Sequence, residues 1–322
     1  MGTISYLTIC FIGIPFITAY NIISAIFRGM GDSKSPMYFI AIACAANIVL
    51  DYVFIGGLRL GPAGAALGTT CAQAISVVIS LCMIIRQRKD FRLSHNIMGQ
   101  ILKIGIPIAL QDGFIQVAFM IITIIANQRG LNDAAAVGIV EKIISFLFLI
   151  PSSMLSTVSA LGAQNIGAGK RQRANETLRY AVMITVGFGI IVGIFMQFFA
   201  SPVVALFTDA SDSQGAEVVR LGGQYLRGYV WDCMFAGIHF SFSGYFCACG
   251  KSGISFLHNI IAITLVRIPG VYLTSTLFPD TLFPMGLATA AGSLLSAIIC
   301  VVAFTILNRN EKRLILANKK HQ

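Results

Sequence analysis

The chain has 322 residues, of which 56% are apolar and only 11% are charged. Soluble domains carry charges on about a quarter of their residues, so this composition excludes an ordinary soluble protein and predicts one that lies in a lipid bilayer. The net charge of +10 is typical of nucleic-acid binding in soluble proteins. Its meaning here therefore depends on where the charges lie along the chain.

Nine apolar stretches fill most of the chain, and each is long enough to cross the roughly 30 Å of hydrocarbon in a bilayer. Because backbone groups in lipid must be satisfied within the spanning segment, we expect every stretch to be a helix. The predicted fold class is all-α, a polytopic membrane protein with nine transmembrane helices. In chain order these cover about 4–27, 37–58, 62–85, 104–126, 134–161, 180–207, 224–248, 254–277 and 283–307.

Lys and Arg fall mainly in alternate loops of this map. Of the 23, 17 lie on one side of the membrane, 4 lie on the other, and Lys142 and Arg267 fall within predicted helices. Because cytoplasmic loops are enriched in Lys and Arg, the pattern predicts a multi-pass protein of the plasma membrane with a cytoplasmic C-terminus. It also accounts for the net charge, so the expected partner is membrane lipid and not nucleic acid.

Two parts of the sequence resemble each other. Gly31 precedes Gly250 by 219 residues, and Tyr52 precedes Tyr272 by 220. A chance match of Gly-rich helix ends is the alternative, since Gly and Pro are common in membrane helices. The matched tracts are 27–31, 47–52 and 61–66 in the first part, and 246–250, 267–272 and 283–288 in the second.

If the repeat is real, the second copy holds six helices and the first copy holds only its last three. We therefore expect roughly 120 residues and three helices to be missing ahead of Met1, and the two copies to face the same way as parallel repeats. The expected domains are a partial first lobe with a basic interlobe loop, a six-helix second lobe and a basic cytoplasmic tail. They cover residues 1–99, 100–309 and 310–322.

Several of these motifs resemble the multidrug and toxic compound extrusion (MATE) transporters. The tract Arg-Gly-Met-Gly-Asp-Ser-Lys-Ser-Pro at 28–36, with 47–52 and 61–69, is similar to the family's helices four to six. The tracts at 103–107, 162–170 and 267–269 resemble the start of its seventh helix, the loop after its eighth and its eleventh helix. The resemblance implies a twelve-helix exporter of two six-helix lobes that expels organic cations or amphiphilic compounds in exchange for Na⁺ or H⁺. In many members an acidic residue of the first helix takes part in ion coupling, so coupling in the first lobe is not assigned here.

Ionisable groups inside a membrane cost roughly 2.5–3.5 kcal/mol at a helix centre, and each is therefore a candidate functional residue. Asp112 follows Pro107 by five residues, where a proline-broken helix frees carbonyls, and Gln116 lies one turn further on. Asp112 is either an ion or substrate ligand or a structural carboxylate paired with Lys142 or Arg267. The intramembrane ionisable residues are Asp51, Asp112, Glu141, Lys142, Asp232, His239, His258 and Arg267.

Asp232 and His239 are seven residues apart and share one face of a helix. A carboxylate on this helix resembles the family's second-lobe cation site, although it lies about one turn from the expected place. His239 either relays protons or packs. The predicted second-lobe cavity for ion coupling and substrate thus contains Asp112, Gln116, Glu141, Lys142, Asp232 and His239.

Four further residues have weaker assignments. Asp51 is interpreted as structural, and Arg267 as structural and directed at freed carbonyls or a carboxylate. Tyr20 and Asn21 line the first-lobe cavity or pack within the lobe.

Motifs of enzymes are missing. The sequence has no H-E-x-x-H, and the Gly-Ala-Gly-Lys run at 167–170 lacks the Walker pattern. We predict no enzyme activity, no cofactor and no metal beyond a transported Na⁺. The predicted function is secondary active efflux of cationic or amphiphilic compounds. The alternatives are a lipid-linked oligosaccharide flippase of the same superfamily, or a truncated, non-transporting fragment that assembles with the missing N-terminal helices.

Overall fold

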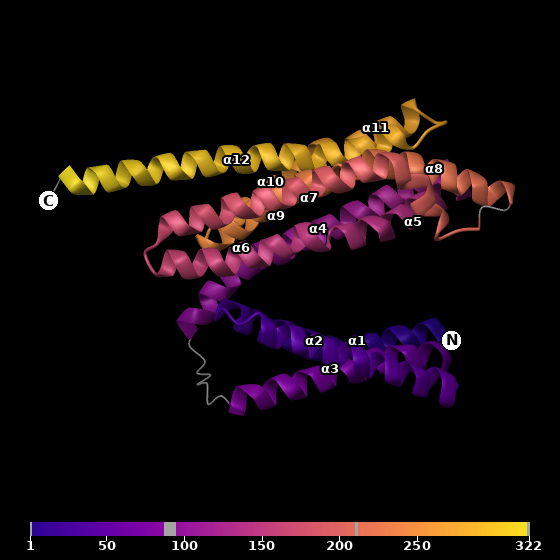
Figure 1. The fold of residues 1–322 in the computed structure, drawn as a ribbon, viewed down its shortest axis with the longest axis horizontal. Coiled ribbons are helices and arrows are strands. Elements are labelled where there is room, and N and C mark those ends of the chain that lie inside the picture. The colour runs from indigo at the N-terminus through magenta and orange to yellow at the C-terminus, as the bar shows by residue number, and fades with distance from the viewer. Residues whose placement is uncertain (1, 87–94, 210–211, 321–322) are drawn as a thin grey trace. The chain divides into compact units, whose positions relative to one another are not determined.

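A computed structural model describes residues 2–86, 95–209 and 212–320 (Figure 1). The described residues form helices joined by short turns and contain no strand, so the all-α prediction is confirmed. They form two compact units, residues 1–94 and 95–322. The first helix of the second unit begins at His95, and the interlobe boundary expected after residue 99 therefore falls inside that helix.

The first unit has three helices. α1 is Gly2–Gly29, α2 is Lys34–Asp51 and continues as the π-helical segment η1 (Tyr52–Gly57), and α3 is Gly61–Arg86. They correspond to the predicted stretches at 4–27, 37–58 and 62–85. α3 packs against α1 and α2, and the apolar core contains Tyr20, Ile23, Phe27, Phe39, Val77 and Ile84. Many other large apolar side chains of this unit are exposed, as expected for helices that face lipid.

The second unit contains the remaining helices. They are α4 (His95–Arg129), α5 (Leu131–Leu147), α6 (Leu149–Gly167), α7 (Arg171–Ala205), α8 (Ser213–Tyr229), α9 (Asp232–Ala248), α10 (Ser252–Ala262), the π-helical η2 (Ile263–Arg267), α11 (Ile268–Leu277) and α12 (Phe283–Lys320). The expected tail at 310–322 thus begins inside α12, whose backbone is helical to Lys320.

Eight helical stretches among the described residues are long and apolar enough to cross a membrane, and the chain is a multi-pass membrane protein. The predicted helix at 224–248 is wrong in one respect, because α8 and α9 divide around Val230 and Trp231. α9 packs against α6, α7 and α12, and 12 of its 17 residues are buried. A helix buried on all sides turns its polar residues toward other helices and not toward lipid. α9 is therefore where a polar interior forms.

Two prolines act differently from each other. The expected break at Pro107 is wrong, since α4 runs through it without interruption. Proline nevertheless leaves the carbonyl four residues earlier without its helical partner. That carbonyl belongs to Lys103, and it accepts a 3.4 Å hydrogen bond from the Ser252 hydroxyl of α10. The freed backbone group is thus used to join two helices.

Near Pro151, by contrast, the predicted helix at 134–161 is interrupted at Phe148.

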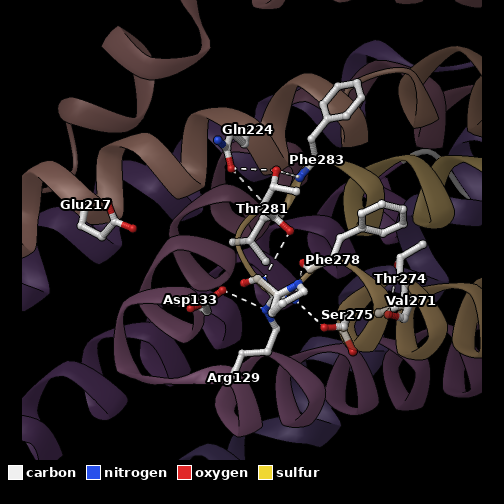
Figure 2. A network of polar contacts seen from close by, with 12 residues as sticks. Arg129, Asp133, Glu217, Gln224, Val271, Thr274, Ser275, Phe278, Thr281 and Phe283 are labelled. Atoms are coloured by element: carbon white, nitrogen blue, oxygen red, sulfur yellow. Dashed lines mark hydrogen bonds and ion pairs between the residues drawn. The ribbon is translucent and has the colours of Figure 1, made fainter.

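Arg129, the last residue of α4, joins two ends of the second unit (Figure 2). Its Nε donates to Asp133 Oδ1 at 2.9 Å. Its Nη1 donates to the Ser275 carbonyl at 2.6 Å and its Nη2 to the Pro279 carbonyl at 2.7 Å. Longer bonds reach the carbonyls of Phe278 and Thr281 at 3.2 and 3.3 Å.

The side chain of Arg129 is only 9% exposed. Carbonyls at and beyond the end of a helix lack intrahelical partners, and one guanidinium satisfies four of them. In the charge pattern of the sequence, Arg129 is one of the four basic residues on the side of the membrane with few Lys and Arg.

Gln224 of α8 completes this contact (Figure 2). Its Oε1 accepts hydrogen bonds from Thr281 Oγ1 at 3.0 Å and from the Leu282 amide at 3.3 Å. The connection between α11 and α12 is therefore fixed to α4 by Arg129 and to α8 by Gln224. We call this set of contacts the Arg129 clasp.

Removing the guanidinium should destabilise the protein. Arg129→Ala leaves several partly buried carbonyls without a donor, and we expect a loss of roughly 2–3 kcal/mol of unfolding free energy. The measurement is thermal unfolding in detergent. The matched control is Arg220→Ala, because Arg220 is about half exposed and its one ion pair among the described residues is with its helical neighbour Glu217. Equal melting temperatures for the two variants would contradict the structural role given to Arg129.

Candidate functional site

The second unit contains a buried ion pair. Arg267 Nη2, at the end of η2, donates to Asp232 Oδ2, at the start of α9, at 2.6 Å. Asp232 is 0% exposed and Arg267 is 7% exposed. Two charges removed from water are tolerated only when they neutralise each other at short range. The sequence left two targets open for Arg267, freed backbone carbonyls or a carboxylate. The structure places the carboxylate of Asp232 next to it.

The local backbone explains how Arg267 reaches this position. It closes a π-helical turn two residues before Pro269, and such turns recur at functional sites. Gly292 of α12 lies directly opposite, where a Cβ would be only 2.8 Å from the Arg267 Cβ. The guanidinium also lies 5.6 Å from the ring centroid of Phe119 on α4, which suits a cation–π contact.

A small polar cavity of about 10 Å³ borders Arg267. Besides Arg267, three residues that line this cavity can form hydrogen bonds. They are Asn259 of α10 and Ser293 and Ser296 of α12. The Ser293 hydroxyl lies beside Asp232. Asp232 Oδ1 and Arg267 Nε are buried, and neither makes a hydrogen bond of ordinary geometry in the described structure.

Two histidines lie along the same interior. His258 of α10 is 0% exposed, and its Nε2 is 2.9 Å from Ser243 Oγ while its Nδ1 is 2.6 Å from Ser296 Oγ. The His239 ring centroid is 5.7 Å from that of His258, and the buried His239 Nδ1 has no hydrogen-bond partner among the described residues. His258 is one of the intramembrane ionisable residues predicted as candidates, but its partners could not be predicted, because the hydroxyls that bind it come from two other helices.

The other predicted second-lobe residues lie differently. Asp112, Gln116 and Lys142 are exposed, and no ion pair joins Asp112 to Lys142 in the described part of the chain. The alternative pairing of Asp112 with Arg267 is also wrong, since Arg267 pairs with Asp232. Glu141 is half-buried and accepts a hydrogen bond of 3.4 Å from Thr123 Oγ1. The structure thus brings Asp232, His239 and Arg267 into one buried region and leaves Asp112, Gln116 and Lys142 at its surface.

The first unit has a cavity of its own, of about 100 Å³. Tyr20 lines it, together with Asn47 of α2 and Gln73 of α3. The Tyr20 hydroxyl, Asn47 Nδ2 and Gln73 Oε1 are buried without a hydrogen-bond partner in the described structure. Asn21 does not line this cavity. It is exposed, and its amide donates to the Ile17 carbonyl of its own helix at 2.9 Å.

Asp51 lies one turn after Asn47 on α2. Its Oδ1 is buried without a hydrogen-bond partner in the described structure, and a Cβ at Gly68 of α3 would overlap this oxygen and approach Asn47 Nδ2. The sequence interpreted Asp51 as structural. Its carboxylate in fact stands among polar atoms that are also without partners, which is the environment of a binding group as much as of a structural one.

The fold is that of solved structures of MATE transporters. With a crystal structure of MATE in complex with MaL6 the TM-score is 0.89 at 20% identity, over 96% of this chain and 70% of that one. The probable multidrug resistance protein YpnP of Bacillus subtilis is 31% identical over 84% of this chain. A protein named FAD transporter from Shewanella oneidensis is 26% identical over 92% of it.

The MatE family model matches residues 3–53 and 107–273, and the chain belongs to this family. The resemblance noted in the sequence is therefore confirmed, as is the prediction of a transporter-family protein and not an enzyme. The chain spans 61% of the length of YpnP and 66% of the Shewanella protein.

Removing one charge of the ion pair should lower the free energy of unfolding more than removing both charges does. We expect Asp232→Asn or Arg267→Gln alone to lower stability by roughly 3–5 kcal/mol, because the remaining charge is buried without compensation. The double variant should be more stable than the sum of the two losses predicts. Thermal unfolding in detergent measures this coupling, and strictly additive losses would mean that the two charges do not stabilise each other.

Proposed function

We propose that the protein is a secondary active exporter of organic cations or cationic amphiphiles, driven by inward movement of Na⁺ or H⁺. The observation that carries the proposal is the buried Asp232–Arg267 pair beside a polar cavity, in a chain of the MatE family. Membrane-embedded carboxylates in protein interiors are characteristic of ion pathways. Names of relatives such as YpnP, a probable multidrug resistance protein, agree with export of foreign compounds.

The charges of the interior support a cationic substrate. Among the residues that the sequence places inside the membrane, four are carboxylates (Asp51, Asp112, Glu141 and Asp232) and two are basic (Lys142 and Arg267). Lys142, which the sequence placed in the cavity, is exposed. A surplus of carboxylates attracts cations and disfavours anions. The same argument weighs against a lipid-linked oligosaccharide flippase, and against an anionic nucleotide such as the Shewanella relative's name specifies.

The proposed setting is the plasma membrane, with the C-terminus in the cytoplasm as the Lys and Arg pattern predicts. The partners are then the surrounding lipid and the exported compound. The transport assay uses the complete protein as the cell makes it.

Transport should require Asp232. With the protein in vesicles and an imposed Na⁺ or H⁺ gradient, ethidium should move against its concentration gradient. Asp232→Asn should slow this movement roughly tenfold or more, because the carboxylate can no longer exchange a cation. Ethidium fluorescence with trapped DNA follows the movement.

The matched control is Glu217→Gln, an outer carboxylate that is exposed and bound to Arg220, which should transport at the wild-type rate. Asp112→Asn distinguishes the site described here from the one predicted from the sequence. Asp112 is exposed and makes no ion pair within the described part of the chain, so its loss should affect transport less than the loss of Asp232. Normal transport by Asp232→Asn at normal protein level would overturn the site assignment, and no gradient-driven movement by the wild type would overturn the function.

A further inference from the structure

A basic hollow lies at the turn between α6 and α7. It is open to the surface and has a volume of about 610 Å³, and the charged residues that line it are Lys170, Arg171, Arg173 and Glu176. The one carboxylate among them, Glu176, accepts a 3.2 Å hydrogen bond from the Gln172 amide. Within the described residues, no ion pair involves Lys170 or Arg173. The hollow therefore has a surplus of positive charge.

Neighbouring helices hold one side of this hollow in place. Tyr245 of α9 is buried, and its hydroxyl donates to Asn175 Oδ1 of α7 at 2.6 Å. The Arg171 guanidinium and the Cys249 thiol lie beside the same hydroxyl. Lys251 follows Cys249 by two residues and is exposed, so the turn between α9 and α10 adds a further cation at this end of the unit. The basic groups are thus arranged by packed helices.

The hollow continues into an apolar face of α7. Tyr180, Ile184 and Ile191 follow Arg173 by 7, 11 and 18 residues, and these spacings return to nearly the same side of an α-helix. All three side chains are more than half exposed, and Arg173 is exposed as well. One side of α7 therefore carries a cation, then a ring with a hydroxyl and then aliphatic side chains. Polarity falls in the same order from the headgroups of a bilayer to its hydrocarbon.

The length of α7 places the cations at headgroup depth. The helix has 35 residues, Arg171–Ala205, and its part from Tyr180 onward is about 39 Å long. That part alone crosses the roughly 30 Å of hydrocarbon. The residues before Tyr180 therefore extend into the headgroup region, on the side that the charge pattern assigns to the cytoplasm. The positive end of the helix dipole lies there too and adds to the attraction for anions.

We propose that this surface binds an anionic phospholipid of the cytoplasmic leaflet. Lys170 and Arg173 contact the lipid phosphate, and an acyl chain lies along Tyr180 and Ile184. A phospholipid matches both parts of the surface, whereas a free phosphate ion matches only the basic hollow. The lipid site is independent of the proposed export function and goes beyond it.

A double variant, Lys170→Gln with Arg173→Gln, tests the lipid site in the complete protein in detergent. Native mass spectrometry follows binding as phosphatidylglycerol is added. The wild type should bind this lipid in preference to phosphatidylcholine. The double variant should bind it about 30-fold more weakly, because each cation near an anionic lipid contributes about fivefold. Both side chains are exposed, so without lipid the variant should unfold at the wild-type temperature.

Single variants separate this surface from charge in general. Arg173→Gln should weaken binding of phosphatidylglycerol about fivefold. Its matched control is Arg220→Gln, which removes an exposed arginine on the other side of the membrane in the charge pattern and should bind as the wild type does. Ile184→Ser keeps every charge and should also weaken lipid binding, because it removes part of the apolar face. Inorganic phosphate is the second probe, and an excess of it should not displace the lipid.

The remaining outcomes contradict the lipid site. Equal binding of phosphatidylglycerol and phosphatidylcholine by the wild type would do so, as would equal effects of Arg173→Gln and Arg220→Gln. Displacement of the lipid by inorganic phosphate, or unchanged binding by Ile184→Ser, would show a simple anion site instead. If the double variant unfolds early, the two single arginine variants decide. Because none of these measurements depends on transport, a failure of the export proposal would leave the lipid result unaffected.

Discussion

The Asp232–Arg267 ion pair is the constraint around which the second unit is built. Neither residue can lie in a bilayer interior alone at acceptable cost, so α9 and η2 must bring them within 2.6 Å of each other. This requirement accounts for features that otherwise have no common reason. α9 is buried on nearly all sides, a π-helical turn precedes Pro269, and the residue of α12 facing Arg267 is glycine.

The same interaction gives the unit a polar interior that can change state. The pair is neutral as a whole, yet Asp232 Oδ1 and Arg267 Nε keep unused hydrogen-bonding capacity beside a cavity. A proton on Asp232 would release Arg267, and the freed cation would have to find a new partner or move with its helix. Neutralising the Asp232 carboxylate would by itself allow a movement, because it removes the electrostatic attraction that holds α9 and η2 together. The Arg129 clasp holds the α11–α12 connection to α4 and α8, and so limits where in this unit such movement can occur.

Much of the fold could be predicted because the length of each apolar stretch can be counted directly along the sequence. The helices of both units follow the apolar runs closely, and the family follows from motifs within single loops. Contacts between distant helices left no such signal. Nothing in the spacing of Asp232 and Arg267, which are 35 residues apart, distinguishes their pairing from that of Asp112 with Lys142. The role of Arg129 was missed for the same reason, since its partners come from α11 and the loop that follows it. Pro107 was misjudged because another helix, through Ser252, satisfies the carbonyl that it frees.

The central claim is that Asp232 exchanges a proton during transport and that Arg267 is its partner when the carboxylate is charged. Infrared difference spectroscopy of the reconstituted protein tests this directly, because a protonated carboxyl group has a carbonyl stretching band that a carboxylate lacks. Acidification should produce a band that ethidium suppresses and that is missing in Asp232→Asn. A spectrum in which this band persists in Asp232→Asn, or in which no such band responds to ethidium, would contradict the account.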